Sequence, residues 1–291
     1  MNTVMNDNKI KSLIHLLEDE DEQAYRLIHS QILEIGPELM PYISDANDRS
    51  ISQVFSDRLT GIYQELNLKN AITEFKEWRE NNSRNLFQGL SILAKFQYPR
   101  LEMRKVTEIV NKIRQDLWLE VNDNLTALEK VRIINHLFFD VYNFKGDSKD
   151  YYAPENSFIN DVLMRKKGNP LNLSAIYSII AQSVNIPIYG VSLPRNYMLV
   201  YVEKLYSQPM SRIKKDDILF FINPFNRGEI HSMNDILNYL RRIKVEPKEE
   251  FYLPCSNIVT LRRSINNLVN IYTKKGDSQK VDSYKSLLEV L

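Results

Sequence analysis

The sequence has very little cysteine, which excludes several kinds of site. Its 291 residues contain one cysteine, Cys255, so no disulfide can form within the chain and no group of thiolates can hold a metal. The first 22 residues hold no apolar segment of the signal-peptide type, and no run is long enough to span a bilayer. We therefore expect a cytoplasmic protein with no metal site and no membrane partner.

The chain also has few glycines and almost no net charge. The chain has eight glycines, and neither GxxxxGK[ST] nor GxGxxG, the motifs that cradle nucleotide phosphates, occurs in it. Thirty-eight lysines and arginines face 37 aspartates and glutamates, so there is no net basic surface for a nucleic acid. We expect no bound cofactor and no nucleic-acid partner.

Helical spacing of apolar residues dominates the first part of the chain. Short helices are expected from Lys9 to about Leu66, separated by the acidic run 18–21 and by the helix-stop pair Gly36–Pro37. This pattern is similar to a HEAT-type repeat, whose apolar face must be covered by a neighbour or a partner. A simple helical cap on the main domain is the alternative interpretation.

The helical pattern continues beyond this segment. It runs from Asn67 to Asn122, where we expect Trp78 and Trp118 to fill the core. Thr126 and Glu129 form a capping-box pattern that opens a further helix.

The middle of the chain predicts a buried helix followed by a small sheet. Leu171–Val184 is apolar on nearly all sides, which is typical of a helix packed on most of its surface. Strands are expected at Ile186–Ser192, Tyr197–Glu203 and Ile218–Ile222, which are rich in branched and aromatic residues. Their links are short, so the sheet should be antiparallel, with 205–215 as a polar connection.

The last part of the chain is again helical. Asp235–Ile243 predicts an amphipathic helix, and two helices around Gly276 and Asp277 form a hairpin similar to a tetratricopeptide unit. The predicted fold class is α+β, mostly helical, with a central helix on a small antiparallel sheet. The predicted domains are a HEAT-like segment at 1–66, the core with its helical lead-in at 67–245, and the hairpin at 246–291.

Several segments resemble the SirB-type branch of the transglutaminase-like superfamily, in order and in spacing, over roughly residues 85 to 290. They are Asn143–Gly146, Asp150–Ser157, Val162–Leu163, Arg165–Ser174, Ile186–Pro187, Val191–Pro194, Ile222–Phe225 and Leu261–Asp277. The resemblance implies a papain-like α+β core with helical flanks.

Active members of that superfamily use a Cys-His-Asp triad, and the resemblance places its three positions in this chain. The nucleophile position, at the start of the central helix, is Pro170; the base position is Asn196; the acid position is Asn223. Proline has no thiol, and asparagine accepts no proton at neutral pH. Asn169 and Pro170 instead suit a helix cap and the first helical position. We call Pro170, Asn196 and Asn223 the triad positions.

These residues predict a catalytically inactive protein that binds a protein or peptide. The expected binding residues are the amides and the ring that would line the remaining cleft: Asn169, Asn172, Asn196, Tyr197 and Asn223. Two alternatives stay open. These amides satisfy buried backbone groups and bind nothing, or the helical flanks act as the scaffold.

An enzyme with a displaced nucleophile is a further alternative. Ser174, on the central helix, and Cys255, paired with His231, are the candidate nucleophiles of a serine- or thiol-type hydrolase or transamidase. Ser174 has no histidine near it in the pattern, and a small residue facing the sheet is the usual explanation. Cys255 follows Pro254 at a junction of loop and helix, where a lone thiol is usually incidental.

Overall fold

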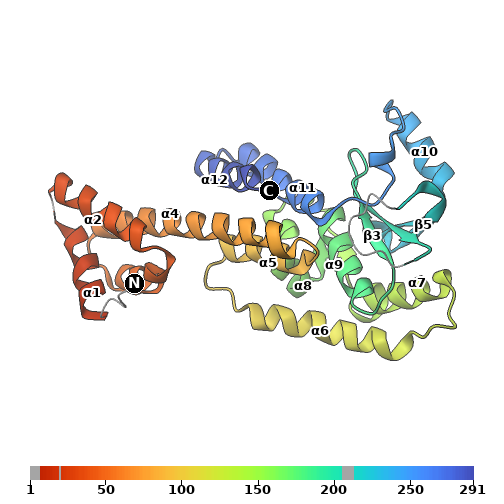
Figure 1. Cartoon of the computed structure of the whole chain (residues 1–291), viewed down its shortest axis with the longest axis horizontal. Coiled ribbons are helices and arrows are strands. Elements are labelled where there is room, and N and C mark those ends of the chain that lie inside the picture. Colours follow the sequence, from red (N-terminus) through yellow and green to blue (C-terminus); the bar gives the residue numbers. More distant parts are fainter. Residues whose placement is uncertain (1–6, 20, 205–212) are drawn as a thin grey trace. The chain divides into compact units, whose positions relative to one another are not determined.

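The computed structural model describes residues 7–19, 21–204 and 213–291 (Figure 1). Within them the chain forms two compact units, Met1–Lys76 and Glu77–Leu291. The α-helices are α1 (Asp7–His15), α2 (Glu22–Ile35), α3 (Met40–Arg49), α4 (Gln53–Glu77), α5 (Leu86–Gln97), α6 (Met103–Glu120), α7 (Ala127–Asn135), α8 (Ile159–Arg165), α9 (Pro170–Gln182), α10 (Met233–Arg242), α11 (Asn257–Lys275) and α12 (Ser278–Glu289). The strands are β1 (Lys145–Gly146), β2 (Lys167–Gly168), β3 (Ile188–Val191), β4 (Met198–Val202), β5 (Ile218–Asn223) and β6 (Glu229–His231).

The first unit is a set of short helices around one apolar core. Asp21 accepts a hydrogen bond from the backbone of Gln23 and caps α2, and Gly36, at φ +109°, ends it before Pro37. The helix-stop prediction at this pair is confirmed. Helix α4 continues through residue 66, and the units separate at residues 76 and 77. The boundaries predicted at 66 and 245, and the HEAT-like and tetratricopeptide-like character of the flanks, stay predictions.

Helix α9 lies at the centre of the second unit, as the sequence predicted. Ten of its 13 residues are buried, and it packs on β3 and β4 and on helices α5, α6, α8 and α11. It begins one residue earlier and ends two residues earlier than expected. The α+β fold class is confirmed.

The main sheet has the order β3-β4-β5-β6, and each neighbouring pair is antiparallel, as predicted. All of β4 is buried because both faces of the sheet are covered. Its Met198, Val200 and Val202 pack in one apolar cluster with Ile236 and Leu240 of α10. Its alternate residues project to the opposite face, and α9 packs against this strand and β3. The polar connection expected at 205–215 lies, up to residue 212, outside the described residues.

Some elements differ from the sequence-based expectation. The strands β1 and β2 pair in parallel through Lys145 with Lys167 and Gly146 with Gly168, although two residues carry no periodicity that would reveal a strand. Trp78 is fully buried and donates from Nε1 to the Asn85 carbonyl, as expected for a core residue. The core prediction for Trp118 is wrong, because its side chain is 67% exposed.

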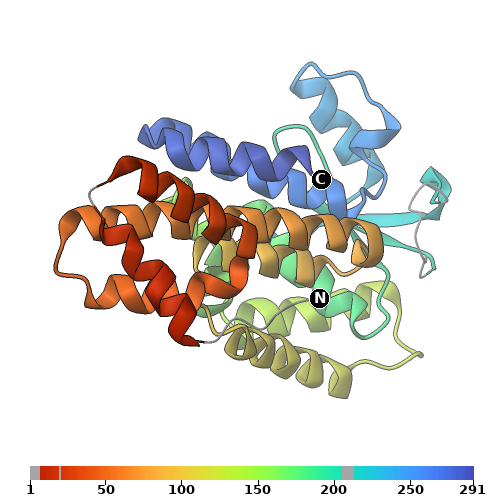
Figure 2. The ribbon, with the colours of Figure 1, turned by 60° about the vertical axis from the view of Figure 1, so that its left-hand side comes forward.

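The chain ends in the expected helical hairpin. Helices α11 and α12 lie side by side in both views (Figures 1 and 2), and Gly276, in the left-handed conformation, ends α11. Thr126 and Glu129 exchange the two hydrogen bonds of a capping box at the start of α7, which confirms that prediction.

Candidate functional site

The start of α9 is a complete helix cap. Asn169 Oδ1 accepts from the backbone N–H of Asn172 at 2.8 Å, and Asn169 Nδ2 donates to Ser157 Oγ at 3.0 Å. Pro170 follows at the first helical position, where its missing N–H costs nothing. Asn169 is 6% exposed and Asn172 is fully buried, so both amides lie inside the protein. Pro170 is half-buried.

The other two triad positions meet at one end of the sheet. In the antiparallel register Leu199 lies opposite Ile222, so the start of β4 and the end of β5 are neighbours. Asn196 stands just before β4 and Asn223 is the last residue of β5, and both side chains are half-buried. Asn196 Oδ1 accepts from the Tyr197 backbone at 2.8 Å, whereas Asn223 Oδ1 is buried without a partner among the described residues.

The chain after Asn223 leads back to the start of α9. The Phe225 ring packs against Gly146, where an added Cβ would lie 2.6 Å from the ring. Gly146 is paired with Gly168, two residues before Pro170. The short helix Pro224–Asn226 also contacts α9. The segment after the acid position therefore packs against the strand pair that leads into the start of α9.

Tyr197 points away from this end of the sheet, into the interface with α11. Its hydroxyl lies 2.7 Å from Thr260 Oγ1 and 3.7 Å from Cys255 Sγ, and burial raises its pKa well above the ordinary value. The side chain is 2% exposed. Asn169, Asn172 and Tyr197 thus present almost no surface, and Asn196 and Asn223 are the half-buried members of the predicted binding set.

The displaced nucleophiles are not assembled into catalytic pairs. The Cys255 backbone N–H donates to Gly190 of β3 at 2.8 Å, whereas His231 is in β6. Because β3 and β6 are the two edges of the sheet, three strand spacings of about 4.8 Å separate them, or about 14 Å. Burial also raises the pKa of the Cys255 thiol, which disfavours the thiolate.

Ser174 is fully buried in α9, and its hydroxyl has no partner among the residues described. In the second unit, the imidazole of His136 pairs with Asp140, and that of His231 lies 3.6 Å from Glu229. Neither ring contacts Ser174 by hydrogen bond, so no base is in place to activate this serine.

Sequence reasoning did not identify Arg263 of α11. Its Nη1 donates to the Leu193 carbonyl at 2.8 Å and to Ser192 Oγ at 3.1 Å. The Leu193 carbonyl also accepts from the backbone N–H of Asn196 at 3.0 Å. The guanidinium therefore holds the turn that carries the base position. An arginine in an amphipathic helix gives no local signal for this role, because its partners are about 70 residues away in the chain.

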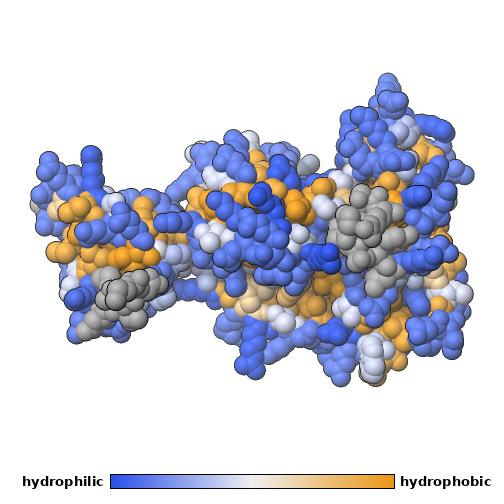
Figure 3. All heavy atoms as spheres, in the orientation of Figure 1, coloured by the Kyte–Doolittle hydropathy of each residue, from blue (hydrophilic) through white to orange (hydrophobic). Residues whose placement is uncertain are grey.

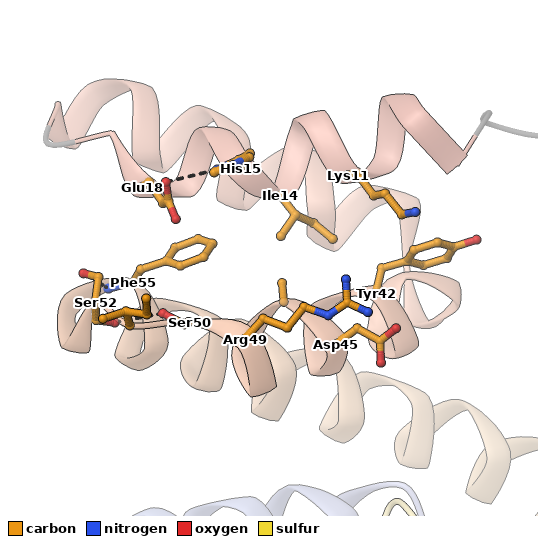
Figure 4. A pocket seen from close by; sticks show the side chains of 12 residues that line it. Lys11, Ile14, His15, Glu18, Tyr42, Asp45, Arg49, Ser50, Ser52 and Phe55 are labelled. Carbon is orange, nitrogen blue, oxygen red and sulfur yellow. Dashed lines mark hydrogen bonds and ion pairs between the residues drawn. The ribbon is translucent and has the colours of Figure 1, made fainter.

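Two cavities lie away from the triad positions. One, of about 680 Å³, is in the first unit between α1, α3 and the start of α4, and Figure 4 shows Ile14 and Phe55 pointing into it. Lys11 and Arg49 are at its rim together with the ion-paired His15 and Glu18. The other, of about 650 Å³, is lined by the polar segments 80–85 and 256–258.

Apolar side chains are also exposed on the first unit, where Figure 3 shows orange surface. Its exposed large apolar residues are Leu16, Leu27, Ile51 and Val54.

Residues 7–19, 21–204 and 213–291 contain neither a candidate metal site nor a membrane-spanning helix. No group of three or more histidine, cysteine, aspartate or glutamate side chains there is placed to hold a metal ion. None of the helices in this part of the chain has the length and apolar character needed to cross a membrane.

The chain is similar to several curated proteins over part of its length. A UPF0162 protein of Xylella fastidiosa (strain Temecula1) is 28% identical over 137 residues, 47% of this chain and 44% of that protein. A UPF0162 protein of Pasteurella multocida is 30% identical over 107 residues, 37% and 36% of the two chains. F-box only protein 21 of Mus musculus is 24% identical over 159 residues, 54% and 24%. Each match spans less than half of the relative's length.

No solved structure matches the chain. The model of the transglutaminase-like superfamily matches residues 103–266, which contain α9, the main sheet and the three triad positions. Because this match covers more than half of the sequence, the chain belongs to the transglutaminase-like superfamily.

Proposed function

We propose that this protein is a catalytically inactive, cytoplasmic member of the transglutaminase-like superfamily, of its SirB-type branch, and that it binds a protein or peptide. One observation carries the proposal. At the place of the nucleophile, buried Asn169 caps α9 and Pro170 takes its first position, and the base and acid positions hold asparagines at the same end of the sheet. Proline and asparagine supply no thiol, no base and no acid at these positions, which supports an inactive protein.

The half-buried amides of Asn196 and Asn223 support binding at this end of the sheet. Asn223 Oδ1 is buried without a partner among the described residues, and a bound water would satisfy such an acceptor. Beside it, Phe225 and Tyr151 form an edge-to-face pair with centroids 6.1 Å apart, and Tyr151 is 43% exposed. Aromatic surface next to hydrogen-bonding amides is the composition of a peptide-binding site.

The inactivity is tested by assays of transamidation, deamidation and proteolysis on the full chain. We expect the same background rate from the wild type and from a variant with Asn196→Ala and Asn223→Ala. A rate that falls in the double variant would show that these side chains perform chemistry and would refute the proposal.

The triad geometry is tested by restoring the side chains. We expect a thiol introduced by Pro170→Cys to react faster with iodoacetamide at pH 6 when Asn196→His and Asn223→Asp are also present. A neighbouring imidazolium and the helix start then stabilise the thiolate. The control is Pro170→Cys alone, and buried Cys255 contributes little reaction in either variant. Equal rates would show that the three positions do not form a triad.

Binding through the first unit is a second candidate, favoured by its 680 Å³ cavity. This would be the scaffold role of HEAT-like helices, with the tetratricopeptide-like hairpin as a second flank. We expect Ala46→Trp, which fills the cavity, to abolish capture of a partner by the full chain if this surface is used, and Asn196→Ala to leave the capture unchanged. The opposite result assigns the binding to the triad positions.

A further inference from the structure

Arg263 is a cation without an acidic partner beside the triad positions. Among the residues described, no carboxylate lies within 4 Å of its guanidinium, and its hydrogen bonds go to a carbonyl and a hydroxyl. Its guanidinium carbon lies 5.6 Å from the centroid of the Tyr197 ring. Tyr151, Tyr239 and Cys255 also interact with it electrostatically, and none of them is a carboxylate. Burial lowers its pKa.

The contacts with the turn before β4 use only one nitrogen of the Arg263 guanidinium. Both hydrogen bonds to that turn come from Nη1, whereas a guanidinium has five N–H donors in a planar fork. A partly buried cation is most stable when an anion accepts from its remaining donors. Arg263 therefore has both the charge and the free donors for a carboxylate.

Neighbouring groups provide the rest of a peptide site. Asn196 Oδ1 accepts from the Tyr197 backbone, which fixes the orientation of the amide and directs Nδ2 elsewhere as a donor. Tyr151 and Tyr152 are 43% and 57% exposed, with ring centroids 5.1 Å apart. Tyr151 also packs against Phe225, which follows the acid position. These rings offer flat apolar surface for a side chain next to the bound carboxylate.

The charge of the site fits one carboxylate better than a phosphate. Lys274 lies on the same face of α11 as Arg263, because eleven residues make about three helical turns. Its ammonium group, however, lies over the Tyr152 ring, 3.8 Å from the centroid, and its Cα is about 16 Å along the helix from that of Arg263. Arg263 supplies one guanidinium with donors that the turn does not use, which matches a unit negative charge, whereas phosphate recognition commonly uses a cluster of arginines.

We propose that Arg263 binds the carboxylate of a peptide at the triad positions, with Asn196 Nδ2 as a second donor and the rings of Tyr151 and Phe225 against the adjacent side chain. The carboxylate is a peptide C-terminus or an aspartate or glutamate side chain. This inference rests on the proposed peptide-binding function.

The test uses the full chain and arrayed acetylated heptapeptides of random sequence. Matched sets carry a free C-terminus or a C-terminal amide, and contain Asp and Glu or their replacements Asn and Gln. A further set carries phosphoserine in place of Glu. We expect peptides with a carboxylate to bind at least tenfold more tightly than their neutral matches, as measured by fluorescence polarisation. If the C-terminal amide removes the advantage, the bound carboxylate is the peptide C-terminus. If Asn and Gln in place of Asp and Glu remove it, the bound carboxylate is a side chain.

Variants then assign the preference to one side chain. Arg263→Gln keeps donors for the turn but removes the charge, so we expect it to lose the tenfold advantage and to bind neutral peptides as the wild type does. Arg263→Lys keeps the charge without the fork and should retain only part of the advantage. Arg262→Gln is the matched control, since its neighbouring guanidinium donates to Leu288 of α12, and it should bind as the wild type.

Three outcomes overturn the inference. In the first, Arg263→Gln keeps the full preference for carboxylates; in the second, peptides bind equally well whatever their charge. In both cases the proposed peptide-binding function stands. In the third, phosphoserine peptides bind more tightly than every carboxylate set. Failure of all sets to bind would instead refute the proposed function, and this inference with it.

Discussion

Replacing Asn169 with alanine tests whether the helix cap holds the centre of the second unit together. The change removes the acceptor for the Asn172 backbone N–H, and leaving a buried donor unsatisfied costs about 1–3 kcal/mol. The Ser157 hydroxyl, also fully buried, loses its donor, which adds about 0.5–1.5 kcal/mol. We therefore expect Asn169→Ala to lower the free energy of unfolding by about 2–4 kcal/mol.

The loss is measured by denaturation with fluorescence detection, because Trp78 is fully buried and belongs to the same unit as Asn169. A change of 1 kcal/mol shifts the thermal midpoint of a unit of this size by about 2–4 °C, so 3 kcal/mol corresponds to about 6–12 °C.

The matched control is Asn85→Ala. Asn85 caps α5 in the same way, accepting from the Gln88 backbone at 3.0 Å, but it is exposed. Water replaces the lost bond there, and we expect a cost of about 0.5–1 kcal/mol. If Asn169→Ala lowers the free energy of unfolding no more than Asn85→Ala does, burial does not add to the stability that the cap provides, and the prediction is refuted.

Two further predictions concern stability in the second unit. Gly228 and Gly276 have nearly the same positive φ, +73° and +74°, but a Cβ on Gly228 would lie 2.1 Å from the Asn135 side chain, whereas nothing lies within 4 Å of one on Gly276. In urea unfolding we expect Gly276→Ala to cost about 1–2 kcal/mol and Gly228→Ala about 1–2 kcal/mol more, and equal costs would contradict the contact. Burial raises the pKa of Asp161. Between its ordinary and its raised pKa the native carboxyl keeps a proton that the unfolded chain has lost, so stability falls as the pH rises through this range. Asp161→Asn, whose amide oxygen still accepts from Tyr98, should therefore gain stability relative to the wild type between pH 4 and pH 7, and a constant difference would refute the assignment.

Much of the fold follows from patterns that the sequence carries locally. Leu171–Val184 is apolar on nearly every side, and such a helix is stable only when packed on every side, which is how α9 lies. The three predicted strands of the main sheet are rich in branched and aromatic residues and are found within two residues of their expected limits. The strand β6 has three residues, too few for a pattern, and it exists because Glu229–His231 pairs with β5.

The two tryptophans show where local patterns fail. Both lie in helical stretches with apolar neighbours, yet Trp78 is buried and Trp118 is 67% exposed. The burial of a large side chain on a helix depends on whether another element covers that face, and a helical period alone does not tell which faces are covered.

The sequence by itself determined how α9 starts. Asn169 caps the helix through a backbone group three residues away and Pro170 needs no donor, so both roles depend on neighbours in the chain. The tertiary structure decided which distant groups meet. Strand register brought Asn196 and Asn223 to the same end of the sheet, and sheet order separated Cys255 from His231. The packing of α11 set Arg263 on the turn before β4. Such contacts arise from pairings between segments far apart in the sequence, and no local pattern encodes them.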